Sequence, residues 1–174
     1  MEIANFSGKR VLICCINKSY EELFERKSWR KEKLDCVNKY WDIPNLEKAN
    51  NVDYIIGYYG NPKIIVVVAK LGKYGWQKVS EIEKLRQEEP VLKNKDYLNR
   101  YAFIGGQDIS DLSEGKIFIN KIVPSHIKFP QFSSKPIYCV NNEVVEWLVF
   151  LISFFISIYR GHISSIFYNI KHTS

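Results

Sequence analysis

The chain has 174 residues, which is enough for one domain with a hydrophobic core and too short for two domains of ordinary size. Hydrophobic residues make up 46% of the sequence, a share that excludes a disordered tail. Lys and Arg outnumber Asp and Glu by 25 to 19, so the charge favours an acidic partner, nucleic acid ahead of a membrane surface, although solubility alone would also explain this surplus.

Five segments rich in β-branched and aromatic residues predict strands. In chain order they are residues 10–16, 52–59, 63–70, 100–106 and 116–123. The sequence GNP between the second and third segments predicts a β-hairpin. The third segment contains the unbroken apolar run IIVVV, which predicts a central strand with both faces covered.

Helical patterns lie between these strands. One follows Ser19, one covers residues 31–41, and one covers residues 79–87, where apolar residues recur at a spacing of three and Pro90 ends the pattern. The lysine-rich residues 85–99 predict a solvated excursion between strands. Helices and strands in this mixture indicate an α+β fold.

Residues 143–161 are the most apolar part of the chain. The run from Val144 to Tyr159 contains Glu146 and is shorter than the roughly 20 residues that a membrane-spanning helix needs. We expect an apolar helix that packs on the sheet or on a partner chain, which would allow a homodimer through residues 143–161, with membrane association as the alternative. The predicted organisation is a domain over 1–142 and a helical extension over 143–174.

Sequence motifs for catalysis or metal binding are missing. The four cysteines form no C-x-x-C pair, and the N-terminus lacks the apolar core of a secretory signal, so free thiols and a cytoplasmic location are expected. The pattern of metal-dependent nucleases would need a carboxylate or amide two residues before Lys70, where Val68 stands. The pattern recurs at Glu114 and Lys116, within a segment expected to be a solvated turn. A binding module without metal or cofactor is therefore the leading class.

A succession of short motifs carries a resemblance over residues 10–142: INKSYEELF, KYWDIPNLEKANNVDYIIGYY, KIIVVVAK, RYAFIGG, INKIVP and KPIYCVNN. In this order they resemble the PUA-like superfamily of nucleic-acid readers, and are most similar to the EVE-like and YTH-like domains fused to McrB-type restriction GTPases. The resemblance implies a curved β-barrel flanked by helices, with a pocket at one mouth for a base turned out of its strand. It also implies a non-catalytic DNA-binding module that recognises a modified base, with an AAA+ GTPase domain or nuclease subunit as partner.

The resemblance also implies site residues. Lys18, Ser19 and Tyr20 match the element that follows the first strand, Trp41 matches the first aromatic wall of the pocket, and Trp76 is the candidate for the second wall. The expected base pocket comprises Asn17, Ser19, Tyr20, Trp41, Asp53 and Trp76. The expected phosphate contacts, which would make affinity fall steeply with salt, are Lys9, Arg10, Lys18, Lys70, Lys73 and Lys78.

Other interpretations of these residues stay open. Asn17 and Ser19 could cap a helix that begins at Tyr20, with Glu22 completing a capping box. Both tryptophans could be core residues, and Asp53 could orient a backbone turn. At the level of function, the alternatives are an RNA-binding PUA-like module and a protein-interaction domain that uses its C-terminal helix.

Overall fold

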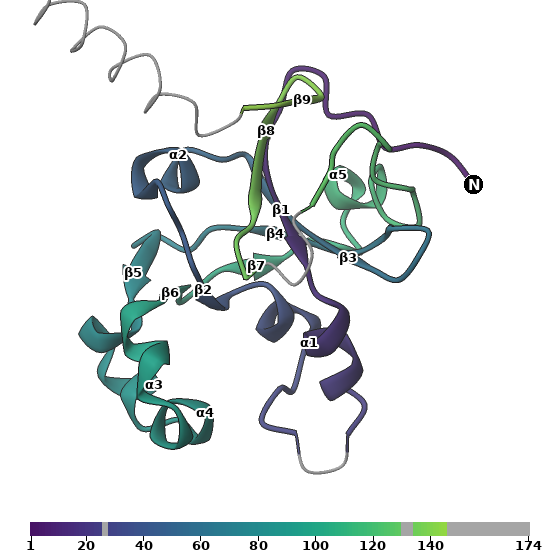
Figure 1. Ribbon diagram of the computed structural model, residues 1–174. Helices are drawn as coiled ribbons and strands as arrows, with labels where there is room; N and C mark the ends of the chain where they lie inside the picture. Colours follow the sequence, from purple (N-terminus) through teal and green to yellow (C-terminus); the bar gives the residue numbers. More distant parts are fainter. Residues whose placement is uncertain (26–27, 130–133, 146–174) are drawn as a thin grey trace, which may run out of the picture. The chain divides into compact units, whose positions relative to one another are not determined.

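The fold is α+β, with a curled, half-barrel main sheet, a second small sheet and a set of short helices (Figure 1). The computed structural model describes residues 1–25, 28–129 and 134–145. Met1–Val144 pack together as one unit, so strand pairing extends two residues beyond the predicted boundary at 142. The predicted α+β class is confirmed.

Six strands of the described residues form the main sheet. Their order is β7 (Gln107–Asp108), β4 (Ile64–Lys70), β3 (Tyr54–Tyr59), β1 (Arg10–Cys15), β8 (Ile137–Val140) and β9 (Glu143–Val144). β1 and β3 run parallel, and the other neighbours pair antiparallel. The predicted hairpin between β3 and β4 is confirmed. Because β1 and β3 are adjacent and parallel, their carboxyl ends lie at the same edge of the sheet.

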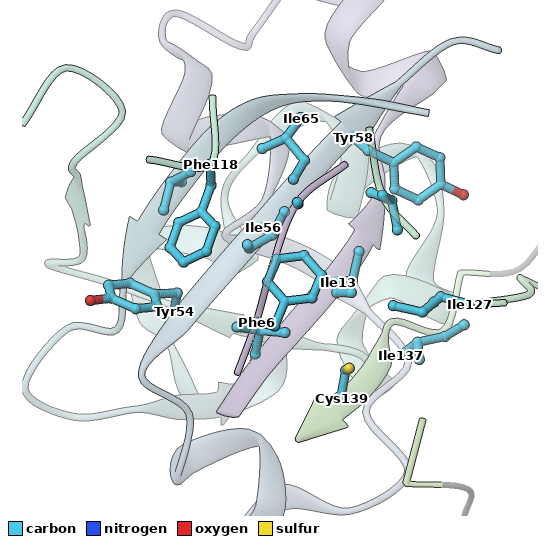
Figure 2. Close-up of a cluster of buried hydrophobic side chains, with 14 of the residues drawn as sticks. Phe6, Ile13, Tyr54, Ile56, Tyr58, Ile65, Phe118, Ile127, Ile137 and Cys139 are labelled. Atoms are coloured by element: carbon cyan, nitrogen blue, oxygen red, sulfur yellow. The ribbon is translucent and has the colours of Figure 1, made fainter. Parts of the chain in front are cut away.

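The main core lies against β1, β3 and β4. Figure 2 shows Ile13, Ile56 and Ile65 from these strands converging with the rings of Phe6 and Phe118, which come from segments that flank the sheet. All five side chains are at most 1% exposed. Burying a side chain of this size stabilises the fold by about 1.5–3 kcal/mol, so these apolar runs hold the strands in register.

The second sheet comprises β2 (Lys39–Trp41), β6 (Tyr101–Phe103) and β5 (Trp76–Lys78), in that order among the described strands. A register shift in β2 places Tyr40 at a φ of 64°. Its ring joins a small core with buried residues of the segment that follows β5, Leu85 and Val91 among them. That segment folds into η2 (Val79–Glu81), α3 (Glu83–Arg86), α4 (Glu89–Lys93) and η3 (Lys95–Asn99). The predicted solvated excursion is therefore a helical layer with apolar anchors.

Two predicted elements are wrong. Residues 116–123 were predicted as a strand, but they form turns after α5 (Ser113–Lys116). Within this segment, Ile122 is the residue that makes isolated β-bridges, one to Ile3 and one to Ile64. Residues 31–41 contain η1 (Lys33–Cys36) and then strand β2 in place of a helix. The remaining described helices are α1 (Asn17–Glu22) and α2 (Leu46–Asn50).

The predicted apolar C-terminal helix and the proposed dimer contact fall almost wholly on residues 146–174, which lie outside the described residues. Within the described ranges, no helix has the length and apolar character needed to cross a membrane.

Candidate functional site

A pocket of about 800 Å³ is lined by Cys15 at the carboxyl end of β1, by residues of α1 and by residues of the α4–η3 segment. Ligand pockets typically measure 300–1,000 Å³, so the space is sufficient for a nucleobase or a small ligand. Residues 85–99, predicted as a solvated excursion, supply one of its walls through Pro90, Lys93 and Tyr97.

Aromatic rings form much of the pocket lining. Tyr40 stacks on Tyr97 with ring centroids 4.8 Å apart and contacts Trp29 at 5.5 Å, while Trp41 lines the pocket at 6% exposure. The Tyr40 hydroxyl donates to Glu88 Oε2 over 2.7 Å. Burial and this hydrogen bond raise the pKa of Tyr40 far above its usual value, so the phenol stays neutral. The rings are therefore held in fixed positions.

A network of buried charges lies beneath these rings. The Arg30 Nε donates to Glu22 Oε2 over 2.9 Å, and the Lys39 Nζ lies 3.0 Å from Glu88 and 3.5 Å from Asp35. The side chains of Arg30 and Lys39 are 8% and 11% exposed. Groups this deeply buried are costly unless each is paired, and the network ties α1 and η1 to β2 and α4.

Arg30 keeps hydrogen-bonding capacity that the fold does not use. Its guanidinium lies 4.1 Å from the Trp29 ring, and its Nη1 donates to the carbonyl of Asp35. Its Nη2 donates to no residue in the described part of the chain. Glu22 Oε1 lies 4.0 Å from Lys18 Nζ. Arg30 and Glu22 both line the pocket, so the lining contains a donor and an acceptor of the kinds that recognise a base edge.

Three of the predicted residues come together at this pocket: Lys18, Ser19 and Trp41. Lys18 is at the rim, with its side chain 90% exposed. Asn17 and Tyr20 belong to the same helix but lie outside the lining. Asn17 Oδ1 accepts from the backbone N–H of Gly60, and α1 begins at Asn17 with no side-chain cap, so the alternative of a capping box is wrong.

Trp76 does not line the pocket, which corrects its expected placement as the second wall. β5 pairs with β6 so that Trp76 lies opposite Phe103, and the two rings meet edge to face at 4.8 Å. The indole is 2% exposed. Trp29 and Tyr97, in place of Trp76, line the pocket together with Trp41.

Asp53 and Arg10 lie at the opposite end of the sheet from the pocket. Asp53 accepts from the backbone N–H of Arg10 over 2.8 Å and from its guanidinium over 2.8 Å. The hydrogen bond from the Arg10 side chain holds the pKa of Asp53 below its usual value. β1 has six residues, so its two ends are roughly 16 Å apart, and Asp53 joins the start of β1 to the start of β3 at the far end.

Lys9 and Lys70 belong to the same distant end. Both ammonium groups lie over the Tyr54 ring, at 5.9 and 6.0 Å from its centroid. Lys70 also pairs with Glu114 at 2.7 Å. These cations thus contact groups of the fold at the amino ends of β1 and β3, and they do not line the pocket.

Lys78 is the last residue of β5, and Lys73 precedes this strand. Lys73 is 5.8 Å from the ring centroid of Tyr74, and Lys78 pairs with Tyr101 across the second sheet. Neither lines the pocket. Of the six expected phosphate contacts, Lys18 is therefore the one that the structure brings to it.

Sequence reasoning missed Trp29, Arg30 and Tyr97. Trp29 and Arg30 lie between α1 and η1, in a segment with no periodic apolar pattern, and Tyr97 lies within the lysine-rich residues 85–99. The adjacent Trp and Arg in an otherwise polar segment are the one local signal that could have drawn attention to them.

Within the described ranges, no group of three or more His, Cys, Asp or Glu side chains is placed to hold a metal ion. Comparison of the chain with protein-family models, curated proteins and solved structures finds no match.

Proposed function

We propose that this chain is a nucleic-acid-binding module that takes one extruded base into the pocket between α1 and α4, without catalysing a reaction on it. The observation that carries the proposal is the pocket itself: aromatic rings line it, together with the paired charges of Arg30 and Glu22. Extruding a base costs a few kcal/mol, and stacking on an aromatic ring returns about 1–3 kcal/mol.

The half-barrel with a pocket at one end supports a PUA-like assignment, in line with the resemblance of residues 10–142. On that basis we propose that the base is a modified base in DNA, and that the module directs a McrBC-like restriction complex, whose GTPase and nuclease activities reside in other domains or subunits. An RNA-binding role is the second candidate, because the same pocket would accept an unpaired base of RNA.

Binding titrations test this proposal. Fluorescence anisotropy with matched DNA and RNA oligonucleotides, with and without methylated bases, should show binding that Trp29→Ala weakens. Tyr74→Ala is the matched control, because Tyr74 is an aromatic residue 69% exposed outside the pocket lining. Tighter binding of modified DNA supports the restriction role, and a preference for RNA supports the second candidate. Absence of binding to every oligonucleotide would refute both.

The salt dependence of affinity distinguishes phosphate binding at the pocket from phosphate binding by the distant lysine and arginine residues. Lys18 and Arg100 are the lining cations without a carboxylate partner closer than 4.0 Å among the described residues. If about two phosphates are held, affinity for a single strand falls about sevenfold between about 50 and 200 mM salt. If all six expected lysine and arginine residues made phosphate contacts, the fall would be about 300-fold.

A further inference from the structure

Arg100 is a half-buried cation of the pocket lining that has no carboxylate partner among the described residues. It lies between η3 and β6, where its backbone N–H donates to the Tyr97 carbonyl and its own carbonyl accepts from the Val79 N–H. Its guanidinium lies 4.9 Å from the Tyr97 ring centroid, and its Nη1 donates to the Tyr40 carbonyl over 3.1 Å. The fold therefore fixes the position of this charge without neutralising it.

The other cations of the lining are either paired or well exposed. Three of them each pair with a glutamate: Arg30 with Glu22, Lys39 with Glu88, and Lys93 with Glu89. Lys18 lies 4.0 Å from Glu22, and its side chain is 90% exposed. Because partly buried charges are screened less than exposed ones, an anion in the pocket would interact more strongly with Arg100 than with Lys18.

The contact with Tyr40 uses one donor of the Arg100 side chain. A guanidinium has five N–H donors, and the Nε and Nη2 of Arg100 donate to no residue in the described part of the chain. A purely structural role, as a support for β2, needs only the contact through Nη1. The remaining N–H groups form the fork that binds two oxygens of a phosphate at once.

The pocket has room for more than a base. Its volume of about 800 Å³ lies in the upper part of the range of about 300–1,000 Å³ found for pockets that hold drug-sized ligands. A nucleobase is smaller than such a ligand. A base alone would therefore leave space that the sugar and phosphate of the same nucleotide can fill.

A series of three rings connects Arg100 to Arg30 through the lining: Tyr97, Tyr40 and Trp29. Successive ring centroids lie 4.8 and 5.5 Å apart, and the two guanidinium groups lie 4.9 and 4.1 Å from Tyr97 and Trp29. Arg30 is compensated by a glutamate, whereas Arg100 is not. A nucleotide whose base stacks on these rings is thus expected to place its phosphate at Arg100.

We propose that the pocket binds a whole nucleotide, with its base against the aromatic rings and its phosphate at Arg100. This inference rests on the proposed function and deepens it, because it names the ligand as a nucleoside monophosphate unit, either within a strand or free. Arg100 is the residue that makes the pocket prefer a nucleotide to a nucleoside.

Isothermal titration calorimetry with the full chain compares nucleosides with their monophosphates, with plain and with methylated bases. The parent should bind a monophosphate about 10- to 150-fold more tightly than its nucleoside, the ratio that corresponds to one hydrogen bond to a charged group. Arg100→Gln should remove this preference, and Arg100→Lys should keep part of it. Arg86→Gln is the matched control and should leave the preference unchanged, because Arg86 is an exposed arginine outside the lining.

The salt dependence of oligonucleotide binding gives a second readout. Fluorescence anisotropy uses a fluorescein-labelled single strand of about 10 nucleotides, as DNA and as RNA, at several salt concentrations. Arg100→Gln should reduce the slope of log affinity against log salt concentration by about 0.7, the value for one phosphate of a single strand. A substitution that only loosens the fold would lower the affinity and leave this slope unchanged, and Arg86→Gln should change neither.

The phosphate site is wrong if the parent binds a nucleoside as tightly as its monophosphate, a comparison that needs no variant, or if Arg100→Gln keeps the preference. Where the monomers bind too weakly to measure, an unchanged salt slope in Arg100→Gln refutes the site. If Trp29→Ala weakens oligonucleotide binding while Arg100→Gln keeps the salt slope, the phosphate site fails and the proposed function stands. If monophosphates bind through Arg100 and no oligonucleotide binds, the pocket serves free nucleotides and the proposed function fails. If neither ligand binds, both fail together.

Discussion

Replacing Glu22 by Gln should destabilise the fold, because it removes the charge that compensates Arg30. The guanidinium of Arg30 is 8% exposed, and its Nε lies 2.9 Å from Glu22 Oε2. A glutamine can still accept a hydrogen bond, but it leaves the positive charge of Arg30 without its closest anion. The variant therefore measures how far the pocket depends on one ion pair.

The magnitude follows from burial. Removing one partner of a fully buried ion pair costs about 3–5 kcal/mol. The Glu22 side chain is 23% exposed, and Arg30 keeps the carbonyl of Asp35 and the ring of Trp29, so about 2 kcal/mol of unfolding free energy is expected. For a chain of this size, such a loss lowers Tm by about 4–8 °C.

Urea unfolding at pH 7, followed by tryptophan fluorescence, measures this loss. Lys18→Gln is the matched control, because it removes a charge 4.0 Å from the other Glu22 oxygen but at 90% exposure, and it should change stability by less than about 0.5 kcal/mol. A double-mutant cycle with Arg30→Met isolates the pair energy. Equal unfolding midpoints for Glu22→Gln and Lys18→Gln would refute the reasoning, since they would mean that the Arg30 charge is solvated.

Three further predictions concern the rest of the described chain. Asp53→Asn should lose about 1 kcal/mol of stability at pH 7. The hydrogen bond from Arg10 lowers the pKa of Asp53, so this stabilisation is present above the unfolded pKa of about 3.9 and is lost as the pH falls through the folded pKa. Thermal melts of the parent and the variant at several pH values measure the loss. Asn142→Ala should lose about 2 kcal/mol in thermal unfolding, since the side chain accepts from the backbone N–H of Phe6 over 2.6 Å and the residue has a φ of 67°. Cys15 should be the first of the four cysteines to react with a maleimide in mass spectrometry, and bound oligonucleotide should slow the reaction, because Cys15 is half-buried in the pocket lining and the others are buried.

The sequence predicts the centre of the fold better than its periphery. β1, β3 and β4 are rich in β-branched and aromatic residues, most of which are buried, and the turn between β3 and β4 is encoded locally. Residues 116–123 carry the same composition, but Phe118 and Val123 reach the core from turns. Apolar spacing reports which residues are buried and cannot tell whether the backbone that carries them is extended.

Some residues of the pocket could likewise be expected from sequence, and others could not. Ser19 and Trp41 were expected at the pocket because their motifs match the resemblance over residues 10–142, and both line it, Ser19 from α1 and Trp41 from the end of β2. The choice between Trp29 and Trp76 as the second aromatic wall depends on the pairing of β5 with β6, which buries Trp76 against Phe103. That pairing joins residues distant in sequence, so no local pattern specifies which indole faces the pocket.

Arg30 differs from the cations at the opposite end of β1 in its burial and in its remaining hydrogen-bonding capacity. At the opposite end of β1, Arg10 is paired with Asp53 and Lys70 with Glu114, so a phosphate there would have to displace a carboxylate. At the pocket, Arg30 is more deeply buried than either of those cations and still has a nitrogen without a partner among the described residues. A hydrogen bond to a charged group contributes about 1.5–3 kcal/mol, so a ligand that accepts from this nitrogen would gain affinity on binding. The same arginine therefore links the stability of the empty fold to the affinity of the ligand, and Arg30→Lys should weaken binding more than it weakens the fold.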